Sequence, residues 1–220
     1  MQDPEIVVVA AGEGPDVAAL LPRGATVIAA DGGVERALAL GLDVALVVGD
    51  LDSAGPTAVA AAERAGAVVV RHPVDKDATD LELALLEAAG RRPVRLVVVA
   101  SAGGRLDHLL SSLHVLGAEA LSAIEVDAVL GDAVVHVVRG ERRLEGTAGE
   151  IVTLLALHGP AEGVTTDGLA FPLAGETLLP GSSRGVSNVL ASPTATITVA
   201  RGVLLAIRPG ATVASSGVGR

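Results

Sequence analysis

TVIAADGGVERALALGLDVALVVGDLDS, residues 26–53, sets the fold class of this chain. Two continuous apolar runs, 26–30 and 44–48, enclose an Ala- and Leu-rich stretch whose apolar residues recur with a helical period. Continuous apolar runs are typical of parallel strands that are buried on both faces. A strand, a helix and a second strand form the unit from which mostly parallel sheets are built. The segment therefore predicts an α/β domain.

The same alternation extends from the N-terminus to about residue 120. Further strands are predicted at 6–10, 67–71 and 95–100. Helices are predicted at 34–40, 56–65, 79–89 and 106–116. Each predicted helix is followed by a glycine, which is a common residue at the C-terminal end of a helix.

After residue 122 the pattern changes to short β-branched runs separated by turn residues. These runs lie at 124–130, 133–138, 151–157, 194–199 and 203–207. Because no helical period separates them, they indicate an antiparallel sandwich or a small barrel. We therefore predict two domains: an α/β domain with a mostly parallel sheet at 1–120, and an all-β domain at 121–220.

Composition excludes several functional classes. The chain of 220 residues has 16 basic and 26 acidic residues and a formal net charge of −10, which argues against a nucleic-acid surface. A nucleotide stays compatible with this charge, because Mg²⁺ can mediate the contact. Without cysteine, disulfides and thiolate metal sites are impossible. The N-terminus lacks the basic start and apolar stretch of a signal peptide, and no apolar run approaches the roughly 20 residues of a membrane span. We expect a soluble cytoplasmic protein.

The segment GDLDS, residues 49–53, is the sharpest local signal. If the chain is extended there, Asp50 and Asp52 share one face, because side chains alternate along a strand. Two carboxylates followed by the hydroxyl of Ser53 suit an octahedral metal that keeps waters and phosphate oxygens. The alternative is an ordinary turn in which Ser53 caps the next helix.

DKDATD, residues 75–80, precedes the third predicted helix. Asp77 or Thr79 is expected to cap that helix, and Asp80 suits its positive end. Capping does not account for three aspartates around Lys76. Asp77 or Asp80 could complete a metal shell, and Lys76 could neutralise a phosphate.

GGRLDH, residues 103–108, opens a further helix, and Arg105 could bind a phosphate through its planar fork. The alternative is a glycine-rich turn with an Arg105–Asp107 surface pair. In the second half, Ser187 and Asn188 end a polar loop and could offer paired donors and acceptors to a ligand. In an open α/β sheet, loops beyond the carboxyl ends of the strands converge on the ligand. The acidic loops together therefore indicate Mg²⁺ with a polyphosphate.

Taken together, the motifs of this chain resemble those of the thiamine pyrophosphokinase (thiamine diphosphokinase) family. The resemblance spans nearly the whole chain and rests on six segments in order: ADGG (30–33), GDLDS (49–53), KDATDLELAL (76–85), GGRLDHLL (103–110), TDGLAFPL (166–173) and GVSN (185–188).

This resemblance implies a nucleotide-binding catalytic α/β domain followed by a thiamine-binding β-sandwich. It further implies a homodimer with thiamine near the subunit interface. The implied reaction moves the pyrophosphoryl group of ATP to the hydroxyethyl oxygen of thiamine and yields thiamine diphosphate and AMP. Mg²⁺ is the implied cofactor.

The resemblance also implies roles for individual residues. The Mg²⁺ ligands and catalytic carboxylates would be Asp50, Asp52 and Asp80, with Asp77 as a further catalytic carboxylate. The ATP site would contain Asp31, Lys76, Thr79, Arg105 and Asp107. The thiamine site would contain Gly168, Phe171, Ser187 and Asn188. Either Asp52 or Asp77 would accept the hydroxyl proton, unless no dedicated base is needed.

The chain departs from the family pattern at two places. Members often carry Tyr or Trp where this chain has Phe171, its only aromatic residue. Phe171 is therefore expected either to stack on thiamine or to pack in the core. The helix after Asp107 reads LLSS at 109–112, where the family more often has a small residue followed by Asn.

Two other functions are compatible with the N-terminal motifs. One is a related pyrophosphokinase acting on another hydroxyalkyl heterocycle, such as a pterin. The other is a non-catalytic nucleotide-binding protein, against which the intact carboxylates argue. The loop ending in Ser187 and Asn188 and the second domain favour thiamine.

Overall fold

The structure is a computed structural model, and it describes residues 5–211. Residues 1–4 and the end of the second predicted domain, 212–220, lie outside this range. The described residues divide into two compact units, 5–132 and 133–211. Within residues 5–211, no helix has the length and apolar character needed to cross a membrane.

The first unit is a parallel sheet with helices. Its strands are β1 (Glu5–Ala10), β2 (Thr26–Ala30), β3 (Val44–Gly49), β4 (Val68–Arg71), β5 (Arg95–Ala100) and β6 (Glu125–Leu130). Its helices are α1 (Gly33–Ala39), α2 (Pro56–Arg64), α3 (Asp80–Gly90) and α4 (Leu106–Leu116), with short 3₁₀ turns η1 (Ala18–Leu20) and η2 (Glu119–Leu121). The prediction of an α/β domain is confirmed.

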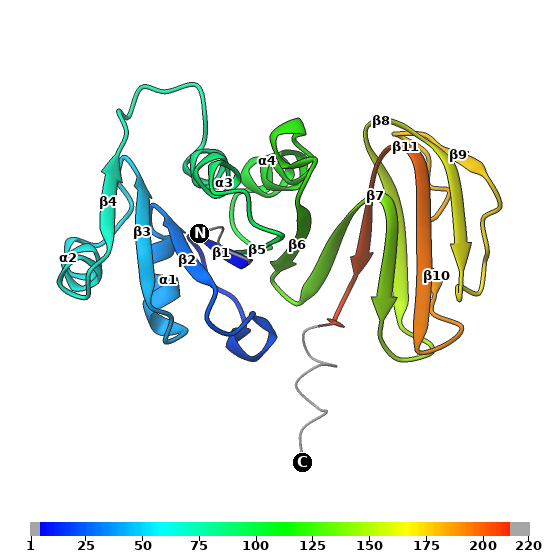
Figure 1. The fold of residues 1–220 in the computed structure, drawn as a ribbon, viewed down its shortest axis with the longest axis horizontal. Coiled ribbons are helices and arrows are strands. Elements are labelled where there is room, and N and C mark those ends of the chain that lie inside the picture. Colours follow the sequence, from blue (N-terminus) through cyan, green and yellow to red (C-terminus); the bar gives the residue numbers. More distant parts are fainter. Residues whose placement is uncertain (1–4, 212–220) are drawn as a thin grey trace, which may run out of the picture. The chain divides into compact units, whose positions relative to one another are not determined.

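The strands lie side by side in the order β6-β5-β1-β2-β3-β4, and every neighbouring pair is parallel. The core on one face joins alternate strand residues, such as Val7, Val9 and Val47, to Val34 of α1 and Val59 of α2. Helices α3 and α4 lie on the opposite side of the sheet (Figure 1). All of the acidic loops therefore follow the same, carboxyl edge of a doubly covered sheet.

Strand β6 differs from the expectation. Residues 124–130 were expected in the second domain. Strand β6 instead pairs in parallel with β5, from Arg95 opposite Glu125 to Ala100 opposite Leu130. Helix α4 is the crossover that leads to β6, and the first compact unit accordingly runs to Asp132. Local composition does not distinguish the last parallel strand from the first antiparallel one, because both are β-branched.

The second unit is β-rich and antiparallel. It consists of β7 (Ala133–Glu145), β8 (Ile151–Asp167), β9 (Glu176–Leu178), β10 (Asn188–Val189) and β11 (Thr194–Arg208). Strand β11 lies between β7 and β8, while β9 and β10 both pair with β8. The runs 194–199 and 203–207, expected as two strands, form the single strand β11.

The three long strands of this unit each change direction at a glycine. Gly140, Gly163 and Gly202 have φ of 80°, 64° and 94°, in the left-handed region that favours glycine. The pairing of β11 shifts register with β7 between Val199 and Leu204, and such irregularities bend strands. One apolar core draws residues from both halves of the bent strands, as in a sandwich.

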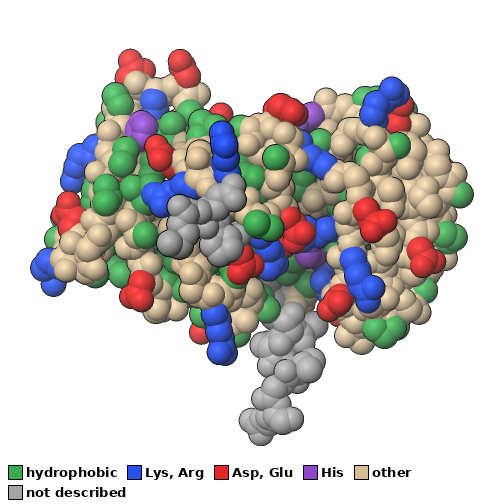
Figure 2. All heavy atoms as spheres, viewed as in Figure 1, with side chains coloured by type: hydrophobic (Ala, Val, Ile, Leu, Met, Phe, Trp, Pro, Cys, Tyr) green, Lys and Arg blue, Asp and Glu red, His purple; other side chains and the backbone are tan. Residues whose placement is uncertain are grey.

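The surface carries charges of both signs. Figure 2 shows Lys and Arg side chains interspersed with Asp and Glu on the face that it draws. This mixture agrees with a chain whose acidic residues exceed its basic residues by ten, 26 against 16.

Candidate active site

Three aspartates form a cluster at the carboxyl edge of the parallel sheet. Asp31 directly follows β2, and Asp50 and Asp52 follow the neighbouring strand β3. One carboxylate oxygen of each lies within 4.8 Å of the other two. The predicted convergence of the ADGG and GDLDS loops therefore occurs, and it brings Asp31 into the group as a full member.

The GDLDS segment is a turn, as in the alternative interpretation, and not an extended chain. Leu51 has a φ of 63°, an unusual conformation for a bulky residue. The backbone N–H of Asp52 donates to Oδ1 of Asp50 over 3.2 Å, a local bond of the kind that aspartate makes in turns. This turn, rather than strand alternation, keeps the two carboxylates together. Backbone strain of this kind is often found at functional sites.

One carboxylate oxygen of Asp31 accepts a hydrogen bond and the other does not. It is buried, its φ is 46°, and Ser53 Oγ donates a hydrogen bond to its Oδ2. Its Oδ1 is buried without a hydrogen-bond partner. Ser53 therefore fixes Asp31 and does not cap α2, whose N-cap residue is Gly55. A buried, unpartnered carboxylate oxygen beside two further carboxylates fits a hard cation such as Mg²⁺.

Lys76 lies between Asp50 and Asp80. Its Nζ forms an ion pair with Oδ2 of Asp50 and lies 3.1 Å from Oδ1 of Asp80. Together with Asp31 and Asp52, which belong to the same group, this makes four carboxylates and one ammonium, a formal balance of −4 and +1, or −3. The remaining negative charge favours binding of a cation, which would reduce the repulsion between the carboxylates.

The electrostatics of the cluster separate the partly buried Asp50 from the exposed Asp52. The hydrogen bond from Lys76, aided by the Asp52 N–H, lowers the pKa of Asp50. The negative charge of Asp50, followed by desolvation and the charge of Asp31, raises the pKa of Asp52. Burial alone would lower the pKa of Lys76, but its bonds to Asp50 and Asp80 outweigh burial and raise it.

Gly49, the last residue of β3, makes room for the cluster. A Cβ on Gly49 would lie 2.9 Å from Oδ1 of Asp80 and 3.1 Å from Cβ of Asp31, with φ at 150°. Asp80 thus reaches the edge of the site from the first turn of α3. It contacts Lys76, whereas the three-aspartate group contains Asp31 where the predicted metal set had Asp80.

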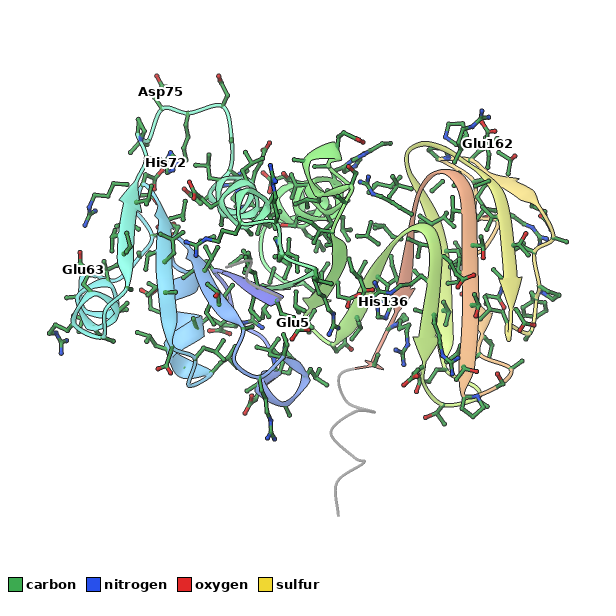
Figure 3. All side chains as sticks on the ribbon, in the orientation of Figure 1. Glu5, Glu63, His72, Asp75, His136 and Glu162 are labelled. Atoms are coloured by element: carbon green, nitrogen blue, oxygen red, sulfur yellow. The ribbon has the colours of Figure 1, made fainter. Side chains whose placement is uncertain are left out.

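Asp77 and Thr79 occupy the segment between β4 and α3. Thr79 is the N-cap residue of α3, and its Oγ1 accepts from the N–H of Glu82 over 3.2 Å, as the capping alternative predicted. Asp77 is exposed and lies outside the three-aspartate group. Figure 3 shows the preceding Asp75 on the same segment, pointing away from the sheet.

Arg105 and Asp107 form the surface pair of the alternative interpretation. Two guanidinium nitrogens contact the carboxylate over 2.6 and 3.2 Å, and the side chains are 70% and 63% exposed. The hydrogen bond from Arg105 lowers the pKa of Asp107 to about 2. Their predicted roles at ATP stay predictions.

The loop after β1 is a part of this region that sequence reasoning missed. A Cβ on Gly12 would lie 2.6 Å from Cβ of Ser101, so the loops that follow β1 and β5 are in contact. The strand order reverses between β1 and β5, which is where open α/β sheets bind ligands. A cavity of about 660 Å³ runs beside this loop and α1 and borders Asp31 through Gly32. The signal available in the sequence was the Gly12-Glu13-Gly14 turn.

The second unit brings together residues predicted to bind thiamine. The side chain of Asn188 bonds to the backbone of Phe171, 17 residues earlier in the chain. Segment 168–171 runs beside β10, since the N–H of Ala191 donates to the carbonyl of Gly168 over 2.8 Å. Ser187, exposed and with φ of 57°, precedes β10.

Phe171 is 62% exposed, so the core-packing alternative is wrong. The second core is filled instead by aliphatic residues such as Leu154 and Ile197. A lone exposed aromatic ring in a chain without Tyr or Trp is a candidate contact for a ligand.

Fold and site together define an α/β ligand-binding unit that carries a carboxylate cluster at its carboxyl edge and is followed by a β-rich unit. Residues 17–133 match the family model described as thiamin pyrophosphokinase, catalytic domain. Residues 135–204 match the model described as thiamin pyrophosphokinase, vitamin B1 binding domain. The chain therefore belongs to the thiamine pyrophosphokinase family.

Individual relatives agree with this assignment. A thiamine pyrophosphokinase of Bacillus subtilis (strain 168) is 26% identical over 198 residues, which cover 88% of this chain and 92% of that protein. The crystal structure of thiamine pyrophosphokinase from Bacillus subtilis matches with a TM-score of 0.81 and 25% identity, over 93% of this chain and 98% of that one. Thiamin pyrophosphokinase from Candida albicans shares the fold, with a TM-score of 0.78 at 13% identity over 94% and 89% of the two chains.

Proposed function

We propose that this protein transfers the pyrophosphoryl group of ATP to the hydroxyethyl oxygen of thiamine, forming thiamine diphosphate and AMP. The observation that carries the proposal is the presence, in one chain, of both family domains with a carboxylate cluster at the sheet edge of the catalytic one. Neither a pterin pyrophosphokinase nor a non-catalytic nucleotide binder accounts for the vitamin B1 binding domain.

Asp31, Asp50 and Asp52 would hold Mg²⁺. Their shared carboxylate oxygens and the unpartnered Oδ1 of Asp31 support this assignment. An ion held by these three carboxylates would supply positive charge that offsets the charge of the phosphates. Asp80 would act beside the group by positioning Lys76, which is paired with both Asp50 and Asp80.

ATP would lie beyond the loops that follow β1 and β5. The reversal of strand order there and the cavity bordering Asp31 support this placement. Arg105 would exchange its exposed partner Asp107 for a phosphate oxygen, and Lys76 would stabilise negative charge on the transferred group. Thr79 would act indirectly, because it caps the helix that carries Asp80.

The reaction forms a bond between the thiamine hydroxyl oxygen and the β-phosphorus. It breaks the bond from that phosphorus to the oxygen shared with the α-phosphate, and AMP leaves. The hydroxyl proton goes to a carboxylate or to solvent. Asp52, a member of the carboxylate cluster, is one candidate acceptor. Since a bound cation holds its ligands as anions, Asp77 is the alternative acceptor.

Thiamine would meet the second unit at Phe171, with Gly168 and Ser187 close by. The cationic thiazolium ring suits the face of an exposed aromatic ring. We include a homodimer in the proposal, supported by the resemblance of the motifs to the family, and we keep the cytoplasmic location expected from the sequence.

A product assay tests the proposal directly. Purified protein is incubated with ATP, Mg²⁺ and thiamine, and AMP and thiamine diphosphate are quantified by chromatography. The two products should appear in equal amounts. ADP in place of AMP, or AMP formation only when a pterin replaces thiamine, would contradict the proposal.

Asp52→Asn tests the carboxylate cluster in the same assay. We expect loss of turnover with an unchanged circular dichroism spectrum, because the exposed Asp52 makes no side-chain contact that the fold requires. Asp75→Asn, on the exposed loop before α3, is the matched control and should keep full activity. Full activity of Asp52→Asn would rule out the metal assignment.

A further inference from the structure

The side-chain amide of Asn188 is buried and makes its hydrogen bonds to the protein backbone. It is 3% exposed. Its Oδ1 accepts from the N–H of Phe171 over 3.0 Å and from the N–H of Val189 over 2.9 Å, and its Nδ2 donates to the carbonyl of Phe171 over 2.7 Å. Both backbone groups of Phe171 are therefore bound by one amide.

This arrangement continues a short antiparallel pairing beyond the point where the backbone supplies it. Ala170 N–H donates to the carbonyl of Val189 over 2.8 Å, and Leu169 forms an isolated bridge with Leu190. At the next rung the chain turns away, because Ser187 takes a left-handed conformation with φ of 57°. The amide of Asn188 replaces the missing backbone partner of Phe171.

An amide is well suited to this position. It offers an acceptor and a donor at once, whereas a carboxylate only accepts and a serine hydroxyl is shorter. The ring that it supports is the only aromatic group in the chain and is 62% exposed. The two bonds fix the backbone from which the exposed ring projects, and so they set the direction of its Cα–Cβ bond.

We propose that Asn188 is a positioning residue that fixes Phe171 for thiamine and does not itself bind thiamine. This proposal rests on the proposed function, since it takes Phe171 as the thiamine contact. It predicts that any effect of Asn188 on thiamine passes through the ring of Phe171.

A double-mutant cycle separates positioning from direct binding. Loss of a cation–π contact corresponds to a rise in thiamine KM of between about twofold and thirtyfold. Asn188→Ala should raise thiamine KM within this range and leave the KM for ATP unchanged. In a Phe171→Ala background, Asn188→Ala should add no further rise. A full additional rise in that background would show that Asn188 contacts thiamine itself and would overturn the proposal.

A control variant addresses general destabilisation. Ile197→Ala removes fully buried side-chain atoms from the core of the same unit, and Ile197 makes none of the hydrogen bonds between Asn188 and Phe171. Assayed below its unfolding transition, it should leave thiamine KM unchanged. A rise equal to that of Asn188→Ala would indicate loss of packing and would refute a specific role.

The single phenylalanine also permits a readout without substrate. Ring-¹³C-labelled phenylalanine gives NMR signals from Phe171 alone. We expect Asn188→Ala to move these signals toward free-phenylalanine values, and Ile197→Ala to leave them in place. Unchanged signals in Asn188→Ala would overturn the positioning role. Because this readout needs no turnover, it stays informative even if the product assay contradicts the proposed function.

Discussion

Replacing Gly49, the last residue of β3, by alanine should displace the carboxylate of Asp80. Ordinary contact begins near 3.4 Å, and the new Cβ would lie 2.9 Å from Oδ1 of Asp80, so 3.4 − 2.9 leaves an overlap of 0.5 Å. The new Cβ would also lie 3.1 Å from the Cβ of Asp31, which is closer than ordinary contact. The carboxylate of Asp80 must therefore move by about half an ångström.

The expected loss of rate follows from this displacement. A misplacement of about 1 Å at a reacting centre costs roughly a hundredfold in rate, so half of that corresponds to about tenfold. We expect kcat to fall about tenfold, the apparent Mg²⁺ requirement to rise, and thiamine KM to stay unchanged. Backbone strain should lower the free energy of unfolding by roughly 1–3 kcal/mol. Steady-state AMP formation, measured over separate Mg²⁺ and thiamine titrations, gives all three kinetic quantities.

Gly41→Ala is the matched control. Gly41 follows α1 with φ of 70°, and a Cβ there would meet nothing within 4 Å. The substitution should strain the backbone by about 1–2 kcal/mol and leave kcat intact. If Gly49→Ala keeps the wild-type kcat and Mg²⁺ dependence, or if Gly41→Ala loses as much activity, the steric argument is wrong.

Three further predictions concern other parts of the molecule. Asp127→Ala should lower the free energy of unfolding in urea by about 2 kcal/mol, which is less than the roughly 3–5 kcal/mol of a fully buried pair because its partner Arg95 is 36% exposed. The substitution should leave kcat unchanged, because the pair lies at the amino end of the strands. An unchanged unfolding midpoint would contradict this prediction. The carboxyl ¹³C signal of Asp107 should titrate with a midpoint near pH 2, and Arg105→Gln should return that midpoint toward 3.8. Because the folded-state pKa is the lower one, the pair stabilises the protein above about pH 3.8 and loses this effect as the pH falls through about 2. A midpoint near 3.8 in the wild type would refute the pairing. Phe171→Ala should raise thiamine KM while changing the free energy of unfolding by less than about 0.5 kcal/mol, as for other exposed side chains, and a large thermal shift would mean that the ring packs after all.

The first half of the chain could be predicted well because its signals are local. Continuous apolar runs, helical periodicity and terminal glycines correctly predicted β1 to β5 and α1 to α4 within one or two residues. The convergence of ADGG and GDLDS followed from the rule that parallel strands share a carboxyl edge. A turn over GDLDS was the alternative prediction, but the left-handed conformation of Leu51 was not predictable, because leucine rarely adopts it.

The second half was less predictable because its features are not local. The direction in which β6 pairs depends on a crossover and not on its own residues. Strand β11 looked like two strands because Gly202 interrupts the apolar pattern at the bend. The bonds between Asn188 and Phe171 join residues 17 apart, and only the folded chain brings them together.

The bent strands of the second unit have a consequence for how it unfolds. A straight strand of 17 residues such as β8 would be roughly 55 Å long, but the bends near Gly163 and Gly202 divide β8 and β11 between both halves of the unit. Neither half can detach while the other keeps its hydrogen bonds, since the same chain segments run through both. Amide hydrogens throughout β7, β8 and β11 should therefore exchange together, in one cooperative opening, and the unit has no smaller piece that can melt first.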